Sequence, residues 1–131
     1  MVRPHLDDQD VARQRLLDAM VEHEYPYLDV HREIIDYAIV LTCRKDGEIA
    51  GFIWFYNTEG KEGTWTIHFL VIPEYRKRFF SRNMGNAIAG TIWALGCNSV
   101  VAENSYKEWM YRLGGYDVED GVQCDLPWKW R

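Results

Sequence analysis

The stretch Thr64 to Gly85, TWTIHFLVIPEYRKRFFSRNMG, decides how this chain is expected to fold. Its first nine residues are mainly β-branched and aromatic, which is typical of a buried strand. Pro73 ends that strand because proline has no N–H to donate to a neighbour. Three cations follow at positions 76–78, and a helical pattern begins at about Phe79. Since a helix N-terminus presents unpaired N–H groups and a positive dipole end, this turn is a candidate site for an anion such as a phosphate.

Length and composition indicate one globular domain spanning residues 1–131. The chain has 131 residues, of which 47% are hydrophobic, and a net charge of −5. The negative charge argues against a general nucleic-acid or membrane-surface binder, so the local cations are expected to serve one small anionic ligand. Three scattered cysteines are too few for a disulfide framework, which favours a reduced, cytoplasmic setting. We expect no signal peptide and no membrane span.

The first half of the chain predicts a helical region followed by a three-stranded meander. Aspartates before Val11 supply N-cap candidates for a helix over 11–24, whose apolar stripe is expected to hold Val11, Leu17, Met20 and Val21. A second, short helix is expected within 27–36. Residues 37–44 and 49–56 are expected as strands joined by an Asp46-Gly47 turn, and a glycine-containing loop leads to the strand at Thr64.

The second half alternates helices and strands. The helix over 79–95 is expected to bury Met84, Ile88, Ile92 and Leu95. A short buried strand at 99–102 precedes a helix through Leu113 that Asn104 or Ser105 would cap, and a last hairpin pairs 116–118 with 122–128. Together these elements predict an α/β domain, or α+β, with a mixed sheet.

Two motifs resemble those of the GNAT family of N-acetyltransferases. The family's acyl-CoA signature is V-x-P-x-x-R-x-x-G-x-G/A, and Val71, Pro73 and Arg76 match it in register, with Phe79 and Ser81 at the glycine positions. The segment 104–116, NSYKEWMYRLGGY, resembles the later family motif N-x-x-A-x-x-x-Y-x-x-x-G-F. The resemblance covers nearly the whole chain, and the chain is similar to small phage-encoded GNAT-like proteins.

This resemblance implies a GNAT-like fold and an acyl-CoA-dependent activity. The implied fold has a central, mostly antiparallel sheet with a V-shaped splay between the fourth and fifth strands, and helices on both faces. The implied reaction moves an acetyl group from acetyl-CoA directly to an unidentified amine. The residues implied in acetyl-CoA binding are Leu70, Val71, Arg76, Lys77, Arg78, Phe79, Phe80, Ser81 and Asn104.

The same resemblance gives Tyr111 the role of the acid that protonates the leaving thiolate, since a phenol stays protonated at neutral pH. The other interpretation places its ring in the core. His68 is the best candidate base, although the sequence also fits, and rather favours, a strand histidine that is hydrogen-bonded in the sheet or exposed. Ordered water or a glutamate, of which Glu103 is one, can also serve as base. Asn104 is either a contact of the CoA arm or a plain N-cap.

A second hypothesis is a catalytically inert GNAT-fold protein, such as a phage virion or assembly component with a protein partner. A side chain of Phe79 or Phe80 that filled the gap beside Val71 would favour it. A homodimer is a further possibility. No metal is expected, because the histidines and cysteines have no ligand spacing. Acidic residues within 22–36 and 114–131 would suit a cationic acceptor.

Overall fold

The computed structural model describes residues 1–119 and 121–128 and contains one seven-stranded sheet of order β1-β2-β3-β4-β5-β7-β6. The strands are β1 (Arg3–His5), β2 (Ile39–Lys45), β3 (Glu48–Asn57), β4 (Thr64–Val71), β5 (Ser99–Ala102), β6 (Tyr116–Val118) and β7 (Gly121–Asp125). The helices are α1 (Gln9–Glu22), α2 (Leu28–Ile35), α3 (Arg82–Ala94) and α4 (Lys107–Arg112), with short 3-10 helices η1 (Pro73–Tyr75) and η2 (Asn104–Tyr106). Strands β4 and β5 are parallel and all other neighbours are antiparallel. The predicted mixed, mostly antiparallel sheet is therefore confirmed.

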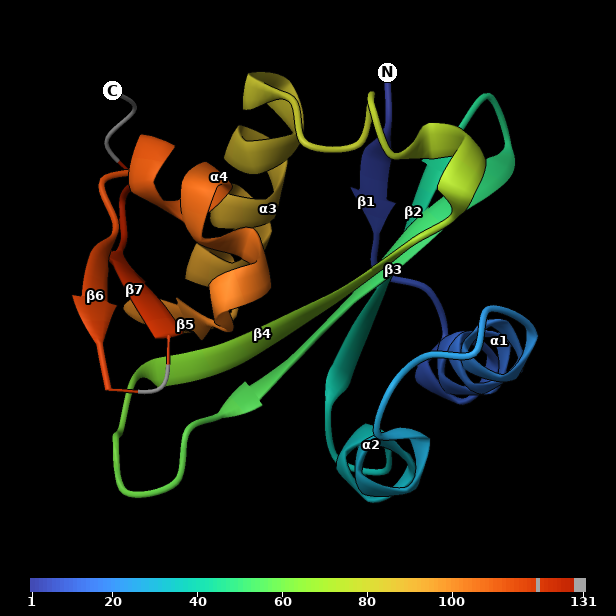
Figure 1. The fold of residues 1–131 in the computed structure, drawn as a ribbon, viewed down its shortest axis with the longest axis horizontal. Helices are drawn as coiled ribbons and strands as arrows, with labels where there is room; N and C mark the ends of the chain where they lie inside the picture. Colours follow the sequence, from blue (N-terminus) through green and yellow to red (C-terminus); the bar gives the residue numbers. More distant parts are fainter. Residues whose placement is uncertain (120, 129–131) are drawn as a thin grey trace.

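Helices cover both faces of the sheet, as expected. Figure 1 shows α1 and α2 on one side of β3 and β4, and α3 and α4 on the other. Each pair of helices closes a separate apolar core. Leu16, Met20 and Ile35 pack with Phe52 and Trp54 under α1 and α2. The second core, under α3 and α4, contains Ile53, Phe55, Ile67, Phe69, Met84, Ile88 and Met110. Strand β3 contributes alternate residues to both cores, which explains its nearly continuous apolar sequence.

Two helices differ in detail from the sequence prediction. The buried stripe of α1 is Ala12, Leu16, Ala19 and Met20, whereas Val11 and Val21 are 44% and 56% exposed. Of the predicted stripe, Met20 is buried and Leu17 is half-buried, but the two valines face solvent because Ala12, Leu16 and Ala19 face the sheet instead. Helix α3 begins at Arg82, three residues later than predicted, because Ser81 is its N-cap and accepts a hydrogen bond from the N–H of Met84.

The outer edge of β2 is closed partly by side chains. Strand β1 pairs only with residues 42–44 of β2. Beyond it, the Gln9 carboxamide makes two hydrogen bonds to the main chain of Val40, at 2.8 and 2.9 Å, and Arg13 donates to the carbonyl of Ala38. A carboxamide carries the same donor and acceptor as a peptide group, so Gln9 replaces one rung of a neighbouring strand.

The sheet opens between β4 and β5. These strands pair only from Thr64↔Ser99 to Thr66↔Val101, although β4 continues to Val71. Past Thr66 the two strands diverge, and within residues 1–119 and 121–128 the edge of β4 that faces away from β3 has no partner strand there. This opening is the V-shaped splay that the sequence predicted, and it positions the candidate site.

Candidate functional site

A cavity of about 770 Å³ lies at the splay. It is lined by His23, Tyr25, Pro26, Phe69, Leu70, Val71, Arg76, Phe80, Glu103, Ser105, Tyr106, Glu108 and Trp109. These residues come from the α1–α2 connection, the end of β4, the loop before α3, and the η2–α4 segment. Its size falls in the range of ligand pockets, which is roughly 300–1,000 Å³.

The main chain of Phe69 and Val71 faces this opening. The N–H of Ile72 donates to Ala50 on β3, while the carbonyl of Phe69 accepts from the Tyr106 hydroxyl on the opposite side. Because successive residues of a strand direct their main-chain groups to opposite edges, Val71 shares the orientation of Phe69 and Leu70 does not. The carbonyl of Leu70 lies against Gly51 of β3, so Leu70 borders the cavity without offering its carbonyl there.

The basic loop brings one of its three cations to the cavity. Arg76 is in the lining, whereas Lys77 and Arg78 are exposed on the loop outside it. The main-chain N–H groups of Phe79 and Phe80 make no hydrogen bond within residues 1–119 and 121–128. They lie beside the N-terminus of α3. Because Phe79 is fully buried, the N–H of Phe80 is the one of the two that an anion could reach, next to the positive dipole end of the helix.

Phe79 is directed away from the cavity. Its side chain is fully buried in the α3–α4 core. The space for its ring exists because residue 51 on β3 is glycine: a Cβ there would lie 2.8 Å from the Phe79 ring. The bulky residue at the family's first glycine position therefore does not fill the gap beside Val71.

Phe80 borders the cavity as part of an aromatic cluster. Its ring contacts Phe69, Tyr106 and Trp109, with centroids 5.2, 5.9 and 4.7 Å away. This cluster forms the wall on the α3–α4 side and narrows the splay without closing it, since the cavity extends past it to Tyr25 and Val71.

Of the two tyrosines on the η2–α4 segment, Tyr106 lines the cavity and the predicted Tyr111 does not; Tyr25 lines it from the α1–α2 connection. The Tyr106 hydroxyl donates to the carbonyl of Phe69 at 3.0 Å, and burial, reinforced by Glu103, raises the pKa of Tyr106 to about 12. The Tyr111 hydroxyl instead donates to Asp117, which raises its pKa, and Tyr111 is not in the cavity lining. The sequence missed Tyr106 because η2 precedes α4, and this short turn changes which residues face the sheet.

Asn104 lies outside the lining of both cavities at the splay and is exposed. It begins η2, while Glu103 is the residue at the cap position and Asn104 makes no side-chain cap bond. The structure therefore brings Glu103, Ser105 and Tyr106 to the site and leaves Asn104 on the surface.

His68 lies on the α1–α2 side of β4, in a cluster of rings. Its Nε2 is 3.1 Å from the Tyr56 hydroxyl, and its ring lies 4.8 Å from that of His31. Burial, with a smaller contribution from His31, lowers the pKa of His68 to about 4. His68 is therefore neutral near pH 7. The Nδ1 atoms of both histidines are buried without a hydrogen-bond partner.

A second cavity, of about 250 Å³, lies on the other side of Glu103. It is lined by Thr58, Lys61, Thr66, His68, Val101, Ala102, Glu103, Val118 and Glu119. Glu103 borders both cavities and directly follows β5, which ends at Ala102.

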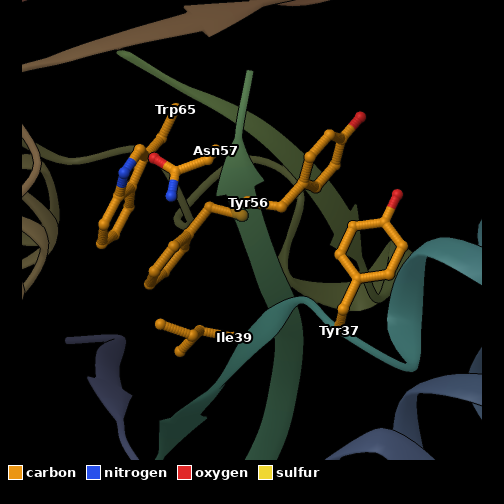
Figure 2. A pocket seen from close by; sticks show the side chains of 6 residues that line it. Tyr37, Ile39, Tyr56, Asn57 and Trp65 are labelled. Carbon is orange, nitrogen blue, oxygen red and sulfur yellow. The ribbon is translucent and has the colours of Figure 1, made fainter. Parts of the chain in front are cut away.

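The other features of the described chain contain fewer groups that could bind a ligand or take part in catalysis. Figure 2 shows a pocket of about 220 Å³ at the end of β3, with Tyr37 and Tyr56 on one side of the strand and Ile39, Asn57 and Trp65 on the other. No acid or base lines it apart from the tyrosines. Among the described residues, no group of three or more His, Cys, Asp or Glu side chains could hold a metal ion. No described helix is both long and apolar enough to cross a membrane.

Comparisons with known proteins agree on one family. The model of the acetyltransferase (GNAT) family matches residues 8–114. No curated protein matches the chain significantly. Among solved structures, an IAA acetyltransferase from Bacillus cereus is 11% identical, with a TM-score of 0.72 over 96% of this chain and 100% of that one. A GNAT-family acetyltransferase from Staphylococcus aureus is 8% identical, with a TM-score of 0.64 over 96% and 99%.

A third solved structure, yncA from Salmonella typhimurium, was determined with its cofactor acetyl-CoA. It is 15% identical to this chain, with a TM-score of 0.62 over 96% of this chain and 94% of that one. At these identities the likeness concerns the fold.

Proposed function

Since the chain belongs to the GNAT family of acetyltransferases, we propose that it transfers an acetyl group from acetyl-CoA to an amine. The observation that carries the proposal is the open edge of β4, where the main chain of Phe69 and Val71 faces a cavity of about 770 Å³. A similar fold was solved with acetyl-CoA as its cofactor, which supports the choice of ligand.

Two parts of acetyl-CoA, the pantetheine arm and the pyrophosphate, match features of this site. The amide groups of its pantetheine arm would pair with Phe69 and Val71, as a partner strand would. Its pyrophosphate would lie at the turn before α3, on the unpaired N–H of Phe80 and beside Arg76. Lys77, Arg78 and Ser81 are placed around the same turn, and the two exposed cations would add attraction at longer range.

The reaction needs a proton at the leaving sulfur. The amine nitrogen attacks the thioester carbon, the C–S bond breaks, and the sulfur receives one proton while the nitrogen loses one. Tyr106 is better placed than Tyr111 to donate it, because its hydroxyl lies in the splay and its raised pKa keeps it protonated. A donor beside the thioester also favours the charge that develops there.

The proton that the amine loses needs an acceptor on the other side of the splay. Glu103 and His68 both border the smaller cavity, where an amine can approach. Glu103 alone borders both cavities, so we place the acceptor role there. His68 then lines the amine side as a neutral ring, consistent with its lowered pKa.

One observation favours a second candidate, an inert GNAT-fold protein. The Tyr106 hydroxyl already donates a hydrogen bond to the carbonyl of Phe69, where the pantetheine arm would bind. The ring of Phe80 also narrows the splay between β4 and β5. In that case the closed splay would be a scaffold feature, and a virion or assembly role would require a protein partner. The similarity to phage-encoded proteins and the cytoplasmic location stay predictions from the sequence.

Calorimetry and thermal unfolding with acetyl-CoA and with CoA distinguish the two candidates. A ligand that binds only the native state stabilises it by about 2.7 kcal/mol at a hundredfold excess over Kd. We expect stabilisation by both ligands and an acetyl-transfer reaction that releases free thiol. No binding at millimolar ligand would overturn the acetyltransferase proposal and favour the scaffold.

A further inference from the structure

The smaller cavity carries an unusual set of charges for its size. Glu103, Glu119 and Lys61 all border it, and none forms an ion pair with another described residue. His68 adds no charge near neutral pH, because its pKa is lowered to about 4. The fixed charges at this cavity are therefore two carboxylates and one ammonium group.

These charges come from different parts of the chain. Glu103 follows β5 at the splay, Lys61 lies on the β3–β4 loop, and Glu119 follows β6. Apolar Val101, Ala102 and Val118 lie among them. A ligand here would therefore meet a carboxylate on the acetyl-CoA side, an ammonium on the loop side, and a short apolar wall between.

We propose that the acceptor is a small amino acid, with its amine on Glu103 and its carboxylate on Lys61. This rests on the proposed acetyl transfer and specifies its substrate class. The volume of about 250 Å³ is below the range of roughly 300–1,000 Å³ for drug-sized ligands, so the group that enters this cavity is small. An amine on Glu103 would lie next to the larger cavity, which Glu103 also borders and where acetyl-CoA is proposed to bind.

Lys61 is the residue that would make the cavity prefer an amino acid over a monoamine or a diamine. A monoamine would leave Lys61 without a partner, and a diamine would bring a second cation near Lys61, with only Glu119 to offset that repulsion. An amino acid pairs with both charges, and a charge-assisted hydrogen bond is among the stronger polar contacts.

The test compares 4-aminobutyrate, n-butylamine and putrescine, which share a four-carbon chain and differ at one end, together with the standard amino acids and β-alanine. Acetyl-CoA is held constant, and both thiol release and acetylated product are measured. We expect 4-aminobutyrate to have a kcat/KM at least about tenfold above that of n-butylamine, its matched monoamine. A tenfold ratio corresponds to about 1.4 kcal/mol, the order expected from one charged contact with Lys61. Lys61→Gln should remove this preference, and Lys61→Glu should shift it toward putrescine. Lys107→Gln, an exposed lysine outside both cavities, should leave it unchanged.

The outcomes separate this inference from the proposed function. If acetyl-CoA binds and putrescine or n-butylamine is the better acceptor, the amino-acid inference is wrong and the acetyltransferase stands. The amino-acid inference is also wrong if acetyl-CoA binds and no amine in the panel is acetylated. It is wrong as well if Lys61→Gln keeps the preference for an amino acid over its monoamine. If acetyl-CoA does not bind the unmodified protein, the proposed function fails first and the inference falls with it.

Discussion

The hydroxyl of Tyr106 donates a hydrogen bond of 3.0 Å to the main-chain carbonyl of Phe69. This contact joins the segment after β5 to the unpaired edge of β4 across the splay. It lies where the pantetheine arm of acetyl-CoA is proposed to pair with β4. When acetyl-CoA binds, the Tyr106 hydroxyl would therefore leave the Phe69 carbonyl and bond to the ligand. The first prediction tests which tyrosine matters.

Tyr106→Phe is expected to lower kcat by about 10²–10⁴-fold, the usual effect of losing a positioned proton donor. Tyr111→Phe is the matched control, because its hydroxyl bonds to Asp117 outside the cavity, and it should lower kcat by less than about tenfold. Steady-state kinetics with acetyl-CoA measures both. The reverse ranking would return the acid role to Tyr111. Tyr106→Phe also removes the bond to Phe69 and should cost about 0.5–1.5 kcal/mol of unfolding free energy.

Arg76→Ala is expected to weaken acetyl-CoA binding, because the guanidinium borders the cavity beside the unpaired N–H groups of the turn. A hydrogen bond to a charged group contributes about 1.5–3 kcal/mol, which corresponds to a roughly 10- to 150-fold rise in Kd. Arg112→Ala removes an exposed arginine of α4 outside the lining and serves as the charge-matched control. Calorimetry measures both, and an equal loss in the two variants would mean that only the overall charge matters.

Phe79→Ala is expected to destabilise the fold by about 3–5 kcal/mol, as for other buried phenylalanines. The ring is fully buried against Gly51, and its removal leaves a cavity between β3 and α3. Phe79→Leu retains much of the volume and should cost less than about 1.5 kcal/mol. Urea unfolding measures these changes. A variant that kept its stability and bound acetyl-CoA more tightly would show instead that the ring obstructs the site.

Stability is expected to fall as the pH falls through the range from 6.5 to about 4. The pKa of His68 is lowered from 6.5 to about 4, and burial also lowers that of His31. The native state then binds fewer protons than the unfolded state within this window, so the free energy of unfolding rises with pH there and is fully recovered above 6.5. For His68 the difference is at most about 3 kcal/mol.

Thermal unfolding of the unmodified protein and His68→Gln between pH 4.5 and 7.5 measures this effect. The variant should lose part of the pH dependence. His5→Gln, at an exposed position, is the control and should keep it. An unchanged slope in His68→Gln would mean that other groups cause the pH dependence.

The sequence predicted the parts of the site that depend on local chemistry. The β-branched run, Pro73 and the cations that follow were sufficient to predict β4, its end and the basic turn, because each reflects a local propensity. The hairpin at Asp46-Gly47 follows from the same kind of signal, since both residues have positive φ, at 51° and 82°.

The side-chain directions depended on distant residues and could not be predicted. Phe79 turns into the core because Gly51, on another strand, leaves room for its ring. Glu103 borders two cavities because β5 stops pairing with β4 after Val101, which follows from the geometry of the whole sheet. Tyr106 replaces Tyr111 at the cavity because a three-residue turn precedes α4, and a motif counted by spacing does not detect it.

The contacts that Gln9 and Arg13 make with β2 also limit how two copies of this protein can associate. Strand β1, the Gln9 carboxamide and the Arg13 guanidinium together occupy the outward main-chain groups of β2 from Ala38 to Arg44. A second molecule therefore finds no free hydrogen-bonding edge there on which to continue the sheet. If the protein dimerises, the sheets of the two copies should not merge along β2.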